Sequence, residues 1–317
     1  MLSLFLALSL WRPAPAAAAP VERVLVGAYL NDIQNLDLKT HSYALDLYIW
    51  FRWKDPKRDP SATFEFLNPA ELWGHVKTPA YDKPQKLSNG EYYQVVRHQG
   101  RFTNKLRLDS YPFDKQLLGV EFEDSSRDEE VQVFYTDPKG LAVNPRLELP
   151  GFDIGAGRIE VQSFVYPTDF GHVGSPGKNT YSRVRIEVPI ARPVATYMMK
   201  LLVPVLCVIF CAALMFLFGP QHLDARIGIG ITALLTIVAL QITLNDDLPE
   251  VAYLVLMDKI YLGAYLFVIA GLGVVVITTR MLEKGQTARA ALWNRWSLTL
   301  LTSLYLASTT VLILLNL

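Results

Sequence analysis

The sequence has only two cysteines, and neither lies in its polar N-terminal part. Cys207 and Cys211 both fall inside the first long apolar run of the C-terminal part, so residues 20–192 cannot form a disulfide. Residues 20–192 also lack an apolar run long enough to cross a bilayer. The apolar excess of the chain is instead concentrated in the first ten residues and after about residue 194.

Motifs for catalysis and for nucleic-acid binding are also missing. The chain carries 30 Lys and Arg against 30 Asp and Glu, so it offers no basic excess to a nucleic acid. Four of its five histidines are scattered through the N-terminal part without metal-ligand spacing, and no nucleophile elbow, P-loop or dinucleotide fingerprint occurs. We therefore predict a protein that is not an enzyme, needs no cofactor and binds no nucleic acid.

The N-terminus combines a short apolar run with a small-residue stretch, WRPAPAAAAP (11–20). A run of about ten residues is too short to span a membrane and is typical of a secretory signal. We predict a signal peptide over 1–19, cleaved near Ala18 or Ala19; because no Lys or Arg precedes the run, an uncleaved anchor is the alternative. Either form exports the chain from residue 20 onward.

Residues 20–192 are typical of short β-strands separated by turns. Segments such as YALDLYIWFRW (43–53) and YSRVRIEVPI (181–190) largely alternate and are rich in β-branched and aromatic residues. Clusters of Pro, Gly, Asn and Asp separate these segments. The pattern predicts an all-β, immunoglobulin-like sandwich that forms an extracellular domain over 20–192.

Four apolar segments follow Pro193, at about 194–218, 227–248, 252–279 and 294–316. Each is long enough, at about 1.5 Å per residue, to cross about 30 Å of hydrocarbon. The connection after the third segment is basic, whereas NDDLPE (245–250) before it is acidic. We predict an all-α, four-helix transmembrane domain over 193–317, with the basic connection in the cytoplasm and the β domain outside.

The second apolar segment carries a stripe of small and polar residues. At about 100° per residue, one narrow face contains Gly228, Thr232, Leu235, Ala239, Ile242 and Asp246. Several copies around an axis could line a water-filled pore with this face. The alternative is that Thr and Gly merely permit close helix packing.

The stretch LDSYPFDKQLL (108–118) resembles the signature loop of the Cys-loop, or pentameric ligand-gated ion channel, family. Other motifs follow in the family's order: WKDP (53–56), ARPVATY (191–197), Pro204 in the first apolar segment and Pro249 after the second. The resemblance covers essentially the whole chain after residue 20. It implies a sandwich of about ten strands on four helices, assembled as a homopentamer in which each chain has four identical partners. The short connection at 280–294 resembles that of prokaryotic members.

Two features depart from the family pattern. The half-cystines that name the family would fall at Asn104 and Leu118, so packing rather than a covalent bond holds the signature loop. An aromatic residue expected after that loop falls near Ser125, which leaves an amine-binding aromatic cage without one wall.

The resemblance also implies a path that couples the β domain to the pore. Arg192 is expected to pair with Asp37 and Asp114, although an interfacial anchor is its alternative. Pro249 either simply ends a helix or also belongs to a loop, 247–251, that the signature loop presses. The pressing residues are Tyr111, Pro112, Phe113 and Asp114.

Two aspartates frame the predicted pore segment and predict its selectivity. Asp224 and Asp246 lie about six turns apart, and fivefold repetition would make each a ring that attracts monovalent cations. Solvated helix caps are the alternative. Arg226 would oppose the ring if it faced the pore, but the family register turns it away.

The resemblance places the agonist between subunits. Tyr166, Phe170 and Tyr181 lie on the predicted capping hairpin, Tyr48 lies on the neighbour's strand, and Arg101 matches an arginine of acid-gated bacterial relatives that could hold a carboxylate. The acidic run at 121–131 is either a solvated loop or a weak divalent-cation site formed by Glu121, Glu123, Asp124 and Asp128. Because carboxylates and histidines can titrate when neighbours shift them, we rank protons, with a small aromatic or carboxylate agonist, above amines.

Together these features predict a ligand- or pH-gated, cation-selective homopentameric channel in the inner membrane of a bacterium, with the β domain on the periplasmic side. The rival interpretation is a membrane-anchored β-sandwich sensor or adhesion protein without conductance. That rival would be a monomer or a dimer.

Overall fold

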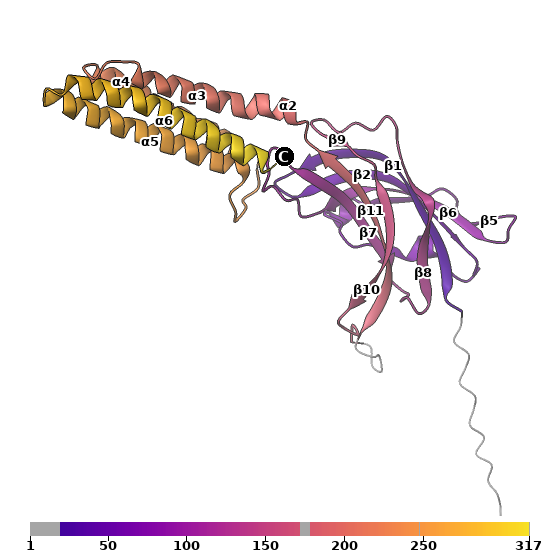
Figure 1. Ribbon diagram of the computed structural model, residues 1–317. Helices are drawn as coiled ribbons and strands as arrows, with labels where there is room; N and C mark the ends of the chain where they lie inside the picture. Colours follow the sequence, from indigo (N-terminus) through magenta and orange to yellow (C-terminus); the bar gives the residue numbers. More distant parts are fainter. Residues whose placement is uncertain (1–19, 172–177, 247, 317) are drawn as a thin grey trace, which may run out of the picture.

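The chain forms a β-sandwich followed by four apolar helices (Figure 1), which confirms the predicted fold class. The computed structural model describes residues 20–171, 178–246 and 248–316. The predicted signal peptide, 1–19, lies outside the described residues, and so does the part of the capping hairpin at 172–177. The C-terminus lies at the end of the helical bundle that adjoins the sandwich (Figure 1).

Two sheets make up the sandwich. The order of the six-stranded sheet is β4 (Val76–Pro79), β6 (Tyr92–Thr103), β2 (Ser42–Trp53), β1 (Glu22–Asp37) and β8 (Gln132–Val143), with β5 (Gln85–Lys86) also paired to β6. The order of the five-stranded sheet is β10 (Arg158–Tyr166), β11 (Asn179–Ala191), β7 (Lys115–Asp124) and β3 (Phe64–Phe66), with β9 (Asp153–Ile154) also paired to β11. Two short turns, α1 (Pro60–Thr63) and η1 (Leu72–Gly74), lie on either side of β3.

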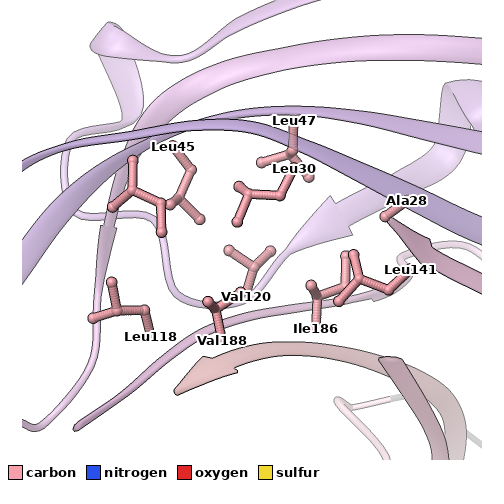
Figure 2. Close-up of a pocket in the computed structure, with 10 residues that line it drawn as sticks. Ala28, Leu30, Leu45, Leu47, Leu118, Val120, Leu141, Ile186 and Val188 are labelled. Atoms are coloured by element: carbon pink, nitrogen blue, oxygen red, sulfur yellow. The ribbon is translucent and has the colours of Figure 1, made fainter. Parts of the chain in front are cut away.

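The core of the sandwich follows from strand alternation, which sends every second side chain inward. On β11, for example, Val184, Ile186, Val188 and Ile190 are buried. Figure 2 shows ten apolar side chains around a void of about 10 Å³ between the two sheets. This volume is close to one water molecule, and a void lined only by apolar groups stays dry.

The first helical span starts irregularly. It consists of α2 (Val194–Tyr197), a π-helical turn (Met198–Leu202), α3 (Val203–Ala213) and a final 3₁₀ turn (Leu214–Phe216). Pro204 explains this start, because proline has no N–H to donate and its ring crowds the carbonyl four residues earlier. The other spans are α4 (Leu223–Asn245), α5 (Leu256–Glu283) and α6 (Thr287–Leu314), and all four are long and apolar enough to cross a membrane.

The helices around the last connection extend further into polar sequence than hydropathy predicts. α5 ends at Glu283 rather than near 279, and α6 begins at Thr287 rather than near 294. Gly285, with φ of +74°, ends α5 with the bond pattern of a Schellman motif, because its N–H donates to Leu282 O over 2.9 Å and Gln286 N–H donates to Met281 O over 2.9 Å. Two basic residues of the predicted connection, Arg280 and Arg289, therefore lie on helical turns.

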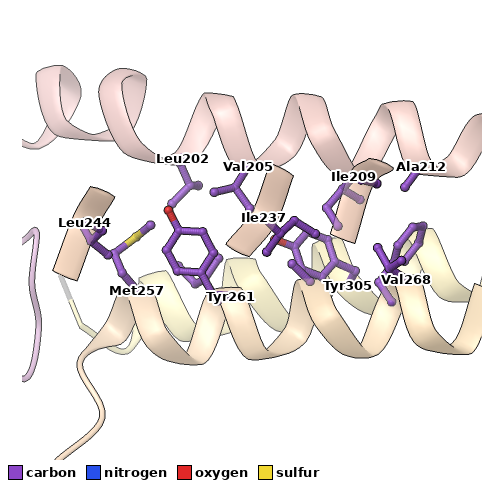
Figure 3. Close-up of a cluster of buried hydrophobic side chains, with 14 of the residues drawn as sticks. Leu202, Val205, Ile209, Ala212, Ile237, Leu244, Met257, Tyr261, Val268 and Tyr305 are labelled. Carbon is purple, nitrogen blue, oxygen red and sulfur yellow. The ribbon is translucent and has the colours of Figure 1, made fainter. Parts of the chain in front are cut away.

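The helical bundle has its own apolar core, and the β domain contributes to it. Figure 3 shows side chains of α3, such as Val205 and Ile209, among side chains from the other three helices. Residues of the signature loop, 108–118, belong to the same buried cluster: Leu108, Tyr111 and Phe113. Ser110 also bonds to the C-terminal end of the chain, where its hydroxyl lies 3.1 Å from Asn316 Oδ1. The two parts of the molecule thus share a continuous packed contact.

Candidate functional site

α4 packs one face against the bundle and leaves the opposite face uncovered in the protomer. Its buried residues are Arg226, Gly230, Ala233, Ile237 and Leu244. Its uncovered stripe contains Asp224 and every residue that the sequence places in the pore: Gly228, Thr232, Leu235, Ala239, Ile242 and Asp246. Leu235 is 64% exposed and Ile242 is 58% exposed, so neither is used for packing within the chain. A stripe that also carries Thr232 and an aspartate at each end does not match a lipid-facing surface, which is apolar.

The hydroxyl groups beside this stripe have their donors satisfied within the helix. Thr236 Oγ1 donates to Thr232 O over 2.8 Å, and Thr243 Oγ1 donates to Ala239 O over 3.0 Å. Each bond links a side chain to the carbonyl one turn earlier. The lone pairs of both hydroxyls therefore stay available to water or to a passing ion.

Arg226 lies on the opposite side of α4 and is fully buried. Its Nε donates to Met215 O over 2.8 Å and its Nη1 donates to Thr278 Oγ1 over 3.1 Å, while its Nη2 donates to Asn294 Oδ1. These acceptors come from the 3₁₀ turn, α5 and α6, so the guanidinium joins three elements behind α4. In the protomer Arg226 therefore does not share the uncovered stripe with Asp224.

The two aspartates at the ends of the stripe have different surroundings. Asp224 lies in the first turn of α4, where the helix dipole favours a negative charge. Asp246 is the C-cap residue, where the dipole disfavours one. Asp246 lines a hollow of about 380 Å³ together with Asp37, Lys39 and Arg192, among others. Lys39 and Arg192 are the basic side chains that line this hollow.

Arg192 and Asp114 form a buried ion pair between the sandwich and the helices. Arg192 Nε donates to Asp114 Oδ1 over 2.8 Å, and the two side chains are only 5% and 2% exposed. Arg192 Nη1 also donates to the Tyr197 hydroxyl over 2.9 Å. Three rings surround the guanidinium, with centroids 4.5 to 4.9 Å from its carbon: Tyr111, Phe152 and Tyr197. This pairing is the one the resemblance implies for Asp114.

Asp37, the other expected partner of Arg192, takes its hydrogen bonds from its own turn. Its carboxylate accepts from Thr40 Oγ1 and from Lys39 N, each over 2.8 Å. The bond from Thr40, followed by smaller contributions that include the charge of Arg101, holds the pKa of Asp37 below its ordinary value. Asp37 and Arg192 line the same hollow as Asp246, but within the described structure they form no ion pair with each other.

The signature loop is bonded directly to the connection between α4 and α5. Asp109 O accepts from Leu256 N over 3.0 Å, and Leu108 N donates to the Tyr253 hydroxyl over 3.0 Å. Pro249 lies half-buried in this connection, and Asp247, two residues before it, lies outside the described residues. A displacement of the signature loop must therefore also move the segment that follows α4.

The predicted binding aromatics of the capping hairpin lie together on the outer face of the five-stranded sheet. The ring of Tyr166 lies 5.3 Å from that of Phe170 and 5.6 Å from that of Tyr181, both nearly edge to face. The Tyr166 hydroxyl donates to Glu123 Oε1 over 2.9 Å. Burial raises the pKa of Tyr166 above its ordinary value, and the contact with Glu123 raises it further.

Tyr48 and Arg101 lie on the six-stranded sheet, on strands β2 and β6. Tyr48 lies beneath Arg97, whose guanidinium carbon is 5.4 Å from the ring centroid. Arg101 Nη2 donates to Ser42 Oγ over 2.9 Å, near the turn between β1 and β2. Within one protomer the predicted ligand residues thus fall on both sheets, and ring contacts join Tyr166 to Phe170 and to Tyr181.

The acidic run carries carboxylates that are already paired with arginines. Asp124 Oδ2 accepts from Arg127 Nη1 over 2.9 Å, while Glu121 and Glu123 both pair with Arg183. Within the described ranges, no group of three His, Cys, Asp or Glu side chains is arranged to hold a metal ion. The arrangement gives no support to the weak divalent-cation candidate, which also included Asp128.

Two histidines that look unrelated in sequence form a hydrogen-bonded pair beside Arg101, in which His98 is buried and His75 is half-buried. His75 Nε2 donates to Arg101 O over 2.8 Å, so its Nδ1, 2.8 Å from His98 Nε2, accepts when both rings are neutral. Burial, followed by the charges of His75 and Lys77, lowers the pKa of His98 to about 4. The pair ties η1 and β4 to β6.

Sequence reasoning missed three residues of these contacts: Phe152, Tyr253 and Arg183. Phe152 and Tyr253 lie outside the matched motifs, and no local pattern marks a residue that packs against a distant loop. Strand alternation places Arg183 on the outward face of β11. Knowing that it lies opposite Glu123 on β7 would have identified the ion pair. That register cannot be read from either strand alone.

The chain is similar to several channel proteins, although no protein-family model matches it. It is 22% identical over 275 residues to the acetylcholine-gated chloride channel subunit acc-1 of Caenorhabditis elegans, which covers 78% of this chain and 56% of that protein. It is 23% identical over 299 residues to a proton-gated ion channel of Gloeobacter violaceus, and the match covers 90% of this chain and 80% of that protein. It is 22% identical over 294 residues to the glycine receptor subunit beta of Homo sapiens, and the match covers 86% of this chain and 57% of that protein. The chain thus spans little more than half the length of two of these relatives.

A β-sandwich on four membrane-length helices defines a multi-pass membrane protein, and its relatives include ion channels rather than enzymes. These similarities support membership of the Cys-loop receptor family of pentameric ligand-gated ion channels.

Proposed function

We propose that the protein is a homopentameric, ligand- or pH-gated cation channel whose pore is lined by α4. The observation that carries this proposal is the uncovered stripe of α4, because all residues predicted for the pore lie on it while the opposite face is packed. Five copies around an axis would turn this stripe into a water path, with hydroxyls along it and an apolar constriction at Leu235.

The charges at the ends of the stripe support selectivity for monovalent cations. Asp224 and Asp246 would each form a ring of five carboxylates, and such rings attract cations and repel anions. Arg226, the nearest cation on α4, is buried behind the helix. The relatives do not decide this point, since one is named a chloride channel and another a proton-gated channel.

A single strand supports the coupling of agonist binding to the pore. β11 carries Tyr181 near its start, and Arg192 follows directly after its end. Arg192 then joins Asp114 of the signature loop, which is bonded to the connection after α4. An agonist or a proton that binds the open state more tightly would act through this chain of contacts.

The same features support a location in the inner membrane of a bacterium, with the β domain on the periplasmic side. Arg280, Lys284 and Arg289 gather around the turn between α5 and α6. The positive-inside rule assigns that end to the cytoplasm. The C-terminal end of α6 then lies on the same side as the β domain (Figure 1), as four spans require.

Currents recorded from the full-length protein in a planar bilayer test the proposal directly. Leu235→Ser should hydrate the constriction and raise the current in the absence of agonist, while Leu266→Ser, on a 60% exposed position of α5, should not. Native mass spectrometry should give five subunits. A monomer or dimer without current in any variant, across pH and a metabolite screen, would favour the anchored sensor instead.

A further inference from the structure

An arginine of the chain itself lies against the aromatic cluster of the capping hairpin. The carbon of the Arg183 guanidinium lies 3.6 Å from the ring centroid of Phe164 and 5.6 Å from that of Tyr166. These distances are within the range of a cation–π contact. Phe164 and Tyr166 also pack edge to face on each other, with centroids 4.9 Å apart.

Polar contacts fix the guanidinium in this position. Arg183 Nη2 donates to the Tyr166 hydroxyl over 2.7 Å and to Glu123 Oε2 over 3.2 Å, while Nη1 pairs with Glu121 Oε2 over 3.4 Å. The side chain is only 8% exposed, so these contacts are shielded from solvent. Because Arg183 projects from the middle of β11, its position is held by the sheet register as well.

Rings, a hydroxyl and carboxylates are the groups that a protein uses to bind a free ammonium ion. Here the π faces of Phe164 and Tyr166 and the oxygens of Glu121 and Glu123 are already engaged by Arg183. A free amine would therefore have to displace a buried cation that is covalently attached to the site. We propose that Arg183 is a specificity-determining residue that occupies the cation position of this aromatic cluster and excludes amine ligands from it.

This inference rests on the proposed function only in treating the hairpin face as the agonist site, and it narrows the agonist to uncharged or acidic molecules. Acidic ligands do not need the position that Arg183 fills. The donors Arg183 Nε and Arg185 Nε are buried without an acceptor within the described structure, whereas the carboxylates of Glu121, Glu123 and Glu187 all accept bonds from cations or from Tyr166. Two N–H donors on this face, Arg183 Nε and Arg185 Nε, thus have no acceptor among the described residues.

Binding of benzylammonium to the detergent-solubilised, full-length protein tests the proposal by isothermal titration calorimetry. The wild type should show no saturable binding at the cluster. Arg183→Ser removes the cation and leaves the rings and both carboxylates, so its affinity for benzylammonium should exceed that of the wild type by about tenfold or more. Arg183→Lys keeps a tethered cation and should continue to exclude the amine.

Arg185→Ser is the matched control, because Arg185 pairs with Glu121 and Glu187 on the same face and covers no ring in the described part of the chain. It should gain no affinity. If Arg183→Ser does not assemble, Arg183→Gln removes the charge with a smaller change in volume and should give the same gain. Tyr166→Leu added to either variant should abolish it.

Equal affinity of the wild type and a folded Arg183 variant for benzylammonium would overturn the proposal. The same holds if Arg185→Ser gains as much affinity as Arg183→Ser, since the effect would then be a general loss of positive charge. Because the calorimetry needs no current, a protein that binds as expected but never conducts would refute the channel proposal and leave this one standing.

Discussion

The buried pair of Arg192 and Asp114 allows stability and gating to be separated by substitution. Arg192→Met should lower the free energy of unfolding by about 3 to 5 kcal/mol, because it leaves the nearly unexposed Asp114 carboxylate without its cation. Gln116 Nε2, which donates to Asp114 Oδ2 over 2.7 Å, would stay as a side-chain donor to this carboxylate. The loss of three ring contacts around the guanidinium places the expected value in the upper half of this range.

A double variant distinguishes a structural role from coupling. Arg192→Met combined with Asp114→Leu replaces the pair by apolar side chains, and such replacements are commonly neutral or stabilising. The unfolding temperature in detergent should therefore return close to that of the wild type. Gating should not return, because a directional bond between β11 and the signature loop has been replaced by a non-directional contact.

Two measurements on each variant decide the outcome: thermal unfolding of the solubilised protein and the stimulus dependence of the current. Arg107→Met is the control, since Arg107 pairs with Asp109 in the same loop but is 85% exposed, and its loss should change stability by less than about 1 kcal/mol. If the double variant recovers gating together with stability, the pair only holds the fold and the coupling argument fails.

Three further predictions concern other parts of the molecule. Asp224→Ala should move the reversal potential in asymmetric salt away from the cation limit; an unchanged value in this variant would contradict the proposed acidic ring. His98 has a pKa of about 4 in the fold, below its ordinary value of 6.5, so the unfolded chain binds more protons between these values. Stability should accordingly fall by about 2 kcal/mol between pH 7 and pH 5, and His98→Gln should flatten this part of the pH profile of the unfolding temperature. Tyr43→Phe should cost about 1 to 3 kcal/mol in chemical denaturation, because Gly119 N loses the hydroxyl that it bonds over 2.8 Å, whereas Gly119 O keeps Asn68; a cost near zero would show that the N–H finds another partner.

Much of the fold could be predicted because its signals are local. Alternation on β2 and β11 assigns their inward faces, and apolar length identifies four spans. The helix ends predicted from the sequence were less accurate, because hydropathy detects only apolar content. α6 instead continues through polar residues such as Asn294. Gly285, whose positive φ ends α5, was a local signal for the true boundary.

Contacts between distant strands could not be predicted, because they depend on register. His75 and His98 meet only because β4 pairs with β6, and Arg183 meets Glu123 only because β11 pairs with β7. Neither strand of a pair shows in its own sequence which residue of the other strand lies opposite it. A shift of one residue in either pairing would separate the partners and leave both sequences unchanged.

The orientation of Arg226 could be predicted only in part from the sequence, because it also depends on packing within the bundle. Asp224 and Arg226 are two residues apart, which is about 200° around a helix, so spacing alone places them on nearly opposite faces. Spacing does not say which face packs against the bundle. The acceptors Met215 O, Thr278 and Asn294 decide that question, because three elements converge on the guanidinium of Arg226 and fix the rotation of α4. Once Arg226 is held there, Asp224 must lie on the uncovered stripe, so the proposed cation-selective ring would depend on a residue on the opposite side of the helix.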